Sequence, residues 1–416
     1  MNLNYKEGKS WPALLALLLL LPSHYYVLGL NIIYIYPCLL LALFVVCNSG
    51  RIPLPKKTGN NLFIVYLFYL AIIAVLQRGI LYGIATAAST LGVLYLVIAI
   101  SSSKNRILKL IRCISVITFI CCILGIFEGI TSVNIFQLLS NSGLSFFTEF
   151  RMGHIRIMAQ FAQPIVYGYF LILVSPLIIY AIVQYRESSK VRLYKLTYIL
   201  MWVNVLLTAS RAVMICFLLL QLIYLYKIGH TKFAIWSFFG MVVLFAIFLM
   251  DQFVGFRFMD TLEAYFSMFS AIFGGESTDV YTGVGNRFEI MSWVIETVGD
   301  DFWFGKGIDS TFSYVVHAWQ IKESIENEYL NTYFHYGLVG VVLQVITFIK
   351  TLLFGFKLAK KSNEEDSFNL IWAISMCLLV FYVVLLTAGQ SSAVTMHIFL
   401  IGILMASFRL YSCAER

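Results

Sequence analysis

The sequence is poor in charge. Asp, Glu, Lys and Arg make up 12% of its residues, whereas about 25% is usual in soluble globular domains. A chain with half of the usual charge cannot present an ordinary water-facing surface, which excludes a soluble fold. Hydrophobic residues make up 60% and aromatic residues 16%, and the mean hydropathy is +0.86. We therefore expect a polytopic membrane protein of the all-α class.

Several chemical signatures are also missing. The eight cysteines form no CxxC pair or metal-ligand spacing, and all of them fall in apolar segments or expected cytoplasmic flanks, so we expect no external disulfide. No Lys-Ser or Lys-Thr follows the glycines of "GVGNRF", as an ATP-binding loop would require. No internal repeat is evident, which disfavours a transporter built from two similar halves. "LLALLLLLP" lacks a small-residue cleavage site, so we expect it to be retained.

Long apolar runs are abundant, and the longest can each cross about 30 Å of hydrocarbon as a helix. Glu128 is an ionisable residue inside one of them, where such a group usually faces a cavity or a partner; a place near the outer headgroups is an equal alternative. Twelve spans are expected, at residues 11–23, 28–47, 60–77, 82–101, 113–132, 162–184, 194–209, 211–226, 232–250, 331–350, 368–388 and 393–410.

The distribution of charge orients these spans. With an even number of spans both termini lie on one side, and the loops on that side carry most of the 29 Lys and Arg residues. Basic residues concentrate in cytoplasmic loops, so we expect both termini to be cytoplasmic. This bias accounts for most of the net charge of +8 without any nucleic-acid partner.

A segment of unusual length separates the ninth and tenth expected spans. We divide the chain into residues 1–250 with spans one to nine, an external loop at 251–330, and residues 331–416 with spans ten to twelve. Long loops are uncommon unless they are functional. Within the loop, "FVGFRFMDTLEAYFSMFSAIF" is typical of an amphipathic helix on the membrane surface, "NRFEIMSWVIETVG" predicts a second helix, and "DDFWFGKGIDSTFSYVVHAW" is expected to be loop or short helix.

Arginines on the outer side recur in three separate segments. Arg211 follows Ser210 at a span start, Arg287 begins the second loop helix, and Arg151 and Arg156 precede span six. Helix N-termini and arginines both favour anions, so together they indicate a phosphate-bearing ligand. For a single residue such as Arg211, snorkelling to the interface is an equal alternative.

Carboxylates mark the end of the large loop. Glu326 and Glu328 in "ENEYLNTYFHYGLVG" are candidate general bases, as is His335. The alternative for both carboxylates is a solvated loop edge or stabilisation of a helix N-terminus. Asn327, Tyr329 and Trp293 are candidate substrate-binding residues, together with Ser210; Tyr329 and Trp293 are more often membrane-interface anchors.

In combination these motifs resemble those of the O-antigen ligase and polymerase superfamily. "LTASRA" resembles its Ser-Arg motif, "RIMAQFAQPIVYGYFLILVSPL" a segment before one of its spans, and "NRFEIMSWVIETVGDDFWFGKGIDSTF" its large-loop pattern. "ENEYLNTYFHYGLVG" then closes the loop as in the family. The resemblance covers roughly residues 145–345 and implies a fold similar to the lipid-dependent glycosyltransferases of the GT-C type.

One departure separates the branches of this superfamily. The ligases carry His at the position of Glu326, and an acidic residue followed by Asn-Glu-Tyr-Leu is more typical of the polymerases. The resemblance therefore favours a polymerase. It leaves the general base open among Glu326, Glu328 and a histidine such as His335 or His154. The alternatives are an O-antigen ligase with lipid A core as acceptor and, in another class, a polysaccharide-lipid flippase or transporter.

The activity implied by the resemblance is glycosyl transfer between polyprenyl-pyrophosphate-linked oligosaccharides at the periplasmic face of the bacterial inner membrane. Arg211, Arg287 and Arg156, with Arg151, would bind the pyrophosphate. The family implies inversion at the anomeric carbon without a metal ion or other cofactor. A regulator of polysaccharide chain length is a candidate partner.

Overall fold

The computed structural model describes residues 10–22, 25–27, 30–48, 59–139, 150–151, 154–229, 285–308, 310–316, 320–322, 325, 327–361, 369–386 and 394–414. The chain forms two compact units. The first comprises Met1–Gly229, Leu343–Val384 and Gln390–Arg416, and the second comprises His230–Val342 and Leu385–Gly389.

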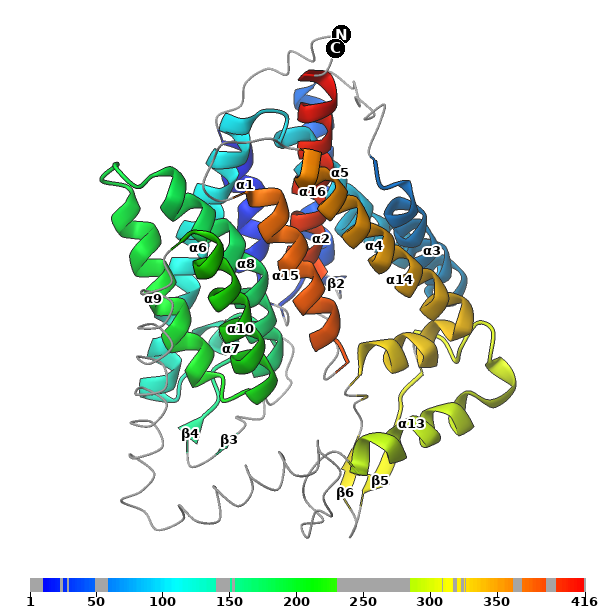
Figure 1. Ribbon diagram of the computed structural model, residues 1–416. Coiled ribbons are helices and arrows are strands. Elements are labelled where there is room, and N and C mark those ends of the chain that lie inside the picture. Colours follow the sequence, from blue (N-terminus) through cyan, green and yellow to red (C-terminus); the bar gives the residue numbers. More distant parts are fainter. Residues whose placement is uncertain are drawn as a thin grey trace, which may run out of the picture. The chain divides into compact units, whose positions relative to one another are not determined.

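The first unit is a bundle of helices (Figure 1). The eight expected spans up to residue 226 and the last two each coincide with a helix. The span expected at 232–250 belongs to the second unit and lies outside the described residues. In chain order the helices are α1 (Trp11–Ala16) with the short 3₁₀ turn η1 (Leu17–Leu20), α2 (Ile32–Cys47), α3 (Asn61–Arg78), α4 (Ile80–Ala87), the π turn η2 (Ala88–Gly92), α5 (Val93–Ile100), α6 (Lys104–Thr131), α7 (Ile135–Leu138), α8 (Pro164–Gln184), α9 (Val191–Leu207), α10 (Arg211–Lys227), α15 (Leu370–Val384) and α16 (Val394–Ala414).

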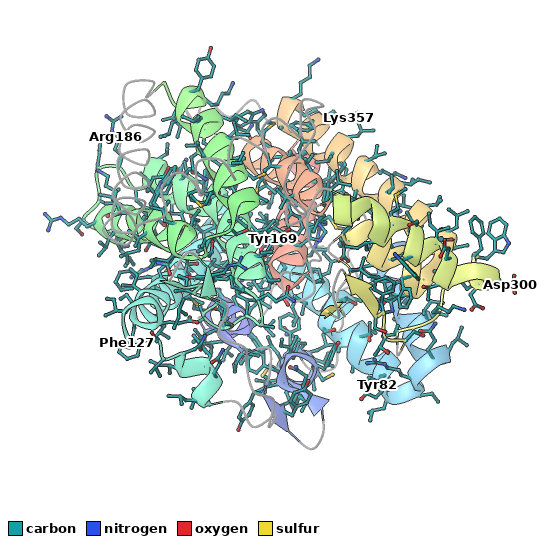
Figure 2. All side chains as sticks on the ribbon, turned by 90° about the horizontal axis from the view of Figure 1, so that it is seen from below. Tyr82, Phe127, Tyr169, Arg186, Asp300 and Lys357 are labelled. Atoms are coloured by element: carbon teal, nitrogen blue, oxygen red, sulfur yellow. The ribbon has the colours of Figure 1, made fainter. Side chains whose placement is uncertain are left out.

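Helix α8 is the core of this unit. It is apolar on all sides, as expected for a helix surrounded by other helices, and it packs against α6, α9, α10 and α15. Tyr169 of α8 is fully buried and its hydroxyl donates to the carbonyl of Val384 at 3.3 Å. Figure 2 shows Tyr169 among interior side chains and Arg186, just after α8, at the periphery.

Five helices of the described chain are long and apolar enough to cross a membrane: Asn61–Arg78, Ile80–Ile100, Lys104–Thr131, Pro164–Gln184 and Glu328–Lys361. Shorter apolar helices accompany them. The protein is therefore a multi-pass helical membrane protein, while the total of twelve crossings stays a prediction. The helix that contains the span expected at 113–132 begins earlier, at Lys104, where Ser103 accepts a hydrogen bond from the amide of Arg106 and caps the charged first turns.

The second unit contains α13 (Gly285–Val298), the 3₁₀ turn η3 (Gly299–Asp301) and the first part of α14 (Glu328–Lys361), which is kinked at Gly337. Its core consists of Ile290, Val294 and Val298 of α13 with Phe312, Ile325 and Phe334. Helix α13 confirms the second helix predicted for the large loop. The amphipathic helix predicted before it lies outside the described residues.

Three small antiparallel hairpins amend the all-α expectation. They are β1 (Tyr26–Val27) with β2 (Leu30–Asn31), β3 (Phe150–Arg151) with β4 (His154–Ile155), and β5 (Tyr314–Val316) with β6 (Gln320–Lys322). Strands of two or three residues pair across tight connections and leave no alternating pattern to detect in the sequence. They do not change the helical class of the fold.

Candidate functional site

The Ser-Arg motif forms the turn between α9 and α10. Ala209 adopts a left-handed conformation with φ +47°, and Ser210 occupies the N-cap position of α10. Ser210 is buried but its hydroxyl does not cap the helix. The first intrahelical bond runs from the amide of Met214 to the carbonyl of Ser210 at 2.9 Å, so the preceding amides of α10 present the positive end of its dipole. Arg211 is the first helical residue; its side chain lies outside the described part.

In the structure, Arg156 lies against this turn and contacts its backbone. Residues 156–160 run through the interior of the first unit, and Arg156 is only 8% exposed. Its Nε donates to the carbonyl of Thr208 at 3.0 Å. The neighbouring amide of Ile157 donates to the carbonyl of Leu207 at 3.3 Å. Two of the three arginine-bearing segments singled out in the sequence therefore meet in one unit. Arg151 lies in β3, paired with His154, and its side chain is outside the described part.

A buried carboxylate holds the segment that carries Arg156. Glu128 of α6 is 3% exposed. Its two oxygens accept from the amide of Met158, each at 3.2 Å, and one also accepts from the amide of Ala159 at 2.9 Å. Asn134 donates from Nδ2 to the carbonyl of Ala159 at 2.9 Å. The sequence indicated that Glu128 has a partner, but it did not show that the partner is the backbone beside Arg156.

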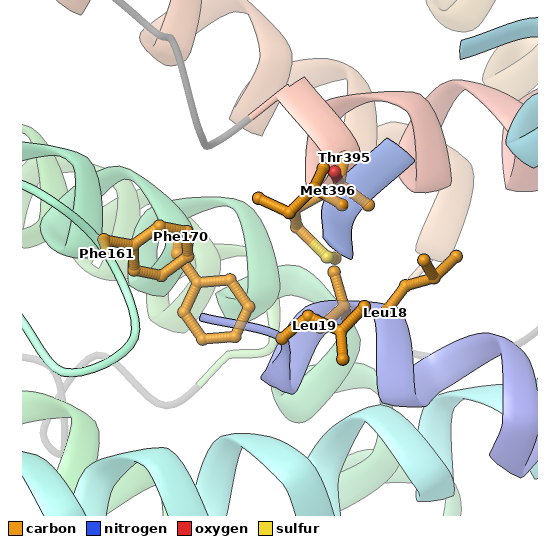
Figure 3. A pocket seen from close by; sticks show the side chains of 8 residues that line it. Leu18, Leu19, Phe161, Phe170, Thr395 and Met396 are labelled. Carbon is orange, nitrogen blue, oxygen red and sulfur yellow. The ribbon is translucent and has the colours of Figure 1, made fainter. Parts of the chain in front are cut away.

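A small cavity that Phe161 lines does not accommodate a sugar. It lies in the first unit and has a volume of ≈ 20 Å³, room for about one water molecule. Figure 3 shows Phe161 and Phe170 on one side of it and Leu18 and Leu19 on another. Its complete lining is Leu18, Leu19, Leu21, Ile33, Phe161, Phe170, Thr395 and Met396. Its size and apolar lining exclude it as a glycan site.

The acidic motif lies in the second unit, at the start of α14. Glu328 is the first residue of the helix and is 7% exposed, and its amide donates to the carbonyl of Leu385 at 2.9 Å. Asn327 caps the helix: its Oδ1 accepts from the amides of Tyr329 at 2.9 Å and Leu330 at 3.2 Å. Tyr329 is half-buried. Glu326 lies outside the described residues.

His335 is fixed by a backbone clasp, which we define as the contact between residues 302–307 and 334–339. The amides of Lys306 and Gly307 donate to the carbonyls of Phe334 and His335 at 2.8 and 3.2 Å. In the reverse direction, the amides of Leu338 and Val339 donate to the carbonyls of Phe302 and Trp303, at 2.9 and 3.2 Å respectively. The clasp thus satisfies backbone groups freed by the kink in α14.

The clasp also determines the tautomer of His335. Nδ1 lies 2.8 Å from the carbonyl oxygen of Gly307, and a carbonyl can only accept, so Nδ1 carries the proton. In the neutral ring the basic lone pair is then on Nε2. This arrangement suits a general base. The sequence predicted a role for His335 but not the clasp. The feature that could have indicated the clasp is the set of glycines in "FGKG" and "HYG".

Arg287 and Trp293 belong to α13 in the same unit. Trp293 is 48% exposed, while Ile290 and Val294 of the same helix enter the core against Phe334. The side chain of Arg287 lies outside the described part. Of the predicted residues, the first unit thus contains Arg151, Arg156, Ser210 and Arg211, and the second contains Arg287, Trp293, Asn327, Glu328, Tyr329 and His335.

The described helices define the class: a multi-pass helical membrane protein whose candidate residues include the starts of α10 and α14. Residues 196–345 match the family model described as "O-Antigen ligase". The match confirms that this part of the chain resembles the O-antigen ligase/polymerase superfamily. The matched range includes Ser210, Arg211, Arg287 and His335 but not Arg156. No curated protein matches the chain.

Proposed function

We propose that the protein is an O-antigen or related surface-polysaccharide polymerase that joins polyprenyl-pyrophosphate-linked repeat units at the periplasmic face of the inner membrane. The observation that carries this choice is the sequence Glu326-Asn327-Glu328, which lies within the range that matches the O-antigen ligase family model. The ligases that the motif resembles carry His at the position of Glu326.

The chemistry follows from the substrate. Each buried methylene of a polyprenyl chain contributes about 0.8 kcal/mol of anchoring, so both substrates stay in the bilayer and react at its surface. The acceptor hydroxyl oxygen attacks the anomeric carbon of the donor, and the bond from that carbon to the pyrophosphate oxygen breaks. The hydroxyl proton passes to a general base, and the pyrophosphate leaves with the bonding electron pair. No ATP is needed because the pyrophosphate is already a good leaving group.

The residues take roles according to their charge. Arg211 and Arg287, with Arg156 and Arg151, neutralise the negative charge that develops on the pyrophosphate. Such electrostatic stabilisation of the transition state is usually the largest contribution to an enzyme's rate enhancement. Glu326, Glu328 or His335 accepts the proton, a step that typically contributes about 10²–10⁴-fold. Ser210, Asn327, Tyr329 and Trp293 bind and orient the glycan.

A ligase is the second candidate, because the matching family model is itself described as that of an O-antigen ligase. It would use the same donor and transfer the glycan to lipid A core.

Complementation of a polymerase-deficient strain tests the proposal. The wild-type gene should restore a ladder of glycan lengths on a gel. At matched membrane levels, Arg211→Ala and Arg287→Ala should abolish the ladder, because each removes a positive charge that neutralises the pyrophosphate leaving group. Among Glu326→Gln, Glu328→Gln and His335→Asn, the variant that loses the ladder identifies the base; Nδ2 of the asparagine in His335→Asn keeps a donor for the Gly307 carbonyl. Arg186→Ala, on the exposed turn after α8, is the matched control and should behave as wild type.

The other outcomes are equally specific. Attachment of single repeat units without a ladder would show a ligase. If every variant behaved as wild type, the assigned residues would be wrong and a flippase or transporter would become the better reading.

A further inference from the structure

The buried carboxylate of Glu128 has contacts that a packing role alone does not explain. An ionisable group at membrane depth is costly unless it is paired. Both oxygens of Glu128 accept hydrogen bonds, and the donors are the consecutive amides of Met158 and Ala159. A carboxylate that accepts from two adjacent backbone amides fixes the position of that backbone.

The backbone it fixes has an unfavourable conformation. Ala159 has φ +46°, a left-handed geometry that costs a non-glycine residue about 1–3 kcal/mol. Its carbonyl accepts from Nδ2 of Asn134 at 2.9 Å while its amide is bonded to Glu128. Asn134 and Glu128 therefore fix this strained residue through both its carbonyl and its amide group.

Helix α6 is shaped to admit this segment. Gly129, adjacent to Glu128, has no side chain where Ile157 and Leu207 approach; a Cβ there would lie 3.3 Å from Cγ2 of Ile157 and 3.4 Å from Cδ1 of Leu207. Leu207 is the last residue of α9, and its carbonyl accepts from the amide of Ile157. The path from Glu128 to the Ser-Arg turn is thus one continuous set of contacts, ending at the bond between Arg156 and Thr208.

We propose that Glu128 is a positioning residue for the pyrophosphate site: through the backbone of residues 158–159 it sets Arg156 against the turn that leads into Ser210 and Arg211. This inference rests on the function proposed above. Glu128 does not touch the substrate; it determines where the buried guanidinium lies. Loss of its contacts displaces Arg156 and weakens the affinity for the pyrophosphate.

Binding of a polyprenyl pyrophosphate to the full-length protein in detergent is the test. The Kd is measured for wild type, Glu128→Gln, Arg156→Ala and the double variant. We expect Glu128→Gln alone to weaken binding about 10-fold, within the range of residues that share one hydrogen-bond network. In the Arg156→Ala background the same change should have no further effect, because the residue through which Glu128 acts is gone. Additive losses, or unchanged binding by Glu128→Gln, would overturn the inference.

A second pair of variants keeps the test independent of folding. Asn134→Ser replaces the amide oxygen that now accepts from the amide of Gln137 by a hydroxyl that can also cap α7, but the shorter side chain cannot reach the Ala159 carbonyl. It should weaken binding in the same Arg156-dependent way. Thr118→Val on α6 removes a hydroxyl that donates to the carbonyl of Ile114 in the same helix, and it should leave the Kd unchanged. If wild type does not bind the probe, the proposed function fails; if it binds and the variants bind equally well, only the role of Glu128 fails.

Discussion

At the scale of single residues, the two glycines of the clasp are the positions at which one added methyl group should matter most. Gly337 has φ +65°, and a Cβ there would overlap the amide of Phe304 and the carbonyl of Trp303. Gly305 has φ +74°, and its Cβ would lie 2.6 Å from the amide nitrogen of Gly337. Neither obstacle is a flexible side-chain end, so the backbones would have to separate.

We therefore expect Gly337→Ala to open the clasp and release His335 from Gly307. The cost should exceed the roughly 1–3 kcal/mol of left-handed strain alone, visible as a lower Tm in detergent and loss of glycan ladders. Gly299→Ala is the control, since Gly299 also has positive φ (+48°) but open space around its Cβ. Equal losses in the two variants would show that close approach at the clasp is unimportant.

Residue chemistry was only partly readable from sequence. The glycines of "FGKG" and "HYG" are visible in the chain, but they are about 30 positions apart, and no local pattern tells that they touch. Asn327 was expected to bind substrate, and its Oδ1 caps α14; cap and ligand roles favour the same residue type. Glu128 was recognised as unusual because burial of a carboxylate needs a partner, yet the partner is backbone, which any sequence supplies.

At the scale of elements, the apolar helices were predictable because a bilayer leaves the backbone few other ways to satisfy its hydrogen bonds. The ends of these helices were less predictable. Helix α6 continues through Lys104 and Arg106, and α14 runs on to Lys361, since charged turns beyond the hydrocarbon keep helical geometry that hydropathy does not detect. The sequence motif at residues 156–160 was noted, but its buried course was not predicted, because an irregular segment has no periodicity.

Two helical glycines, Gly125 of α6 and Gly92 of the π turn η2, provide a prediction in which the same substitution should act with opposite sign. Gly125 packs where a Cβ would overlap Oδ1 of Asn204, which accepts from the hydroxyl of Tyr167 at 2.9 Å. Gly125→Ala should destabilise the packing of α6 against α8 and α9 by about 1–3 kcal/mol, as overpacking of a core usually does.

Gly92→Ala is the matched change. Its Cβ would meet nothing nearer than 3.4 Å, and alanine is the better helix former by about 1 kcal/mol. Thermal unfolding in detergent should show a lower Tm for Gly125→Ala and an equal or higher Tm for Gly92→Ala. A decrease for both would mean that glycine flexibility, and not the close approach of α6 to Asn204, is what these positions require.

At the scale of the whole molecule, composition was decisive for class and the order of motifs for family. The charge deficit excluded a soluble protein without reference to any single residue. The resemblance to the family depends on the order of Ser210-Arg211, Arg287 and the acidic motif along the chain, because none of these motifs is specific alone. The polymerase and ligase share donor, leaving group and reaction, so only the acceptor differs, and one position, Glu326, is the sequence feature that bears on it.

Orientation in the membrane is the prediction that connects these scales. We expect both termini to be cytoplasmic, so the turn between α8 and α9 faces inward and α13 faces outward. Glu187 in that turn and Glu296 on α13 are both exposed. In a background with the native cysteines replaced by alanine, Glu296→Cys should react with a membrane-impermeant maleimide added to spheroplasts, and Glu187→Cys should react only after lysis. The reverse pattern would place α13 in the cytoplasm and would contradict the proposed periplasmic site of glycosyl transfer. The labelling therefore tests the location of the chemistry independently of any activity.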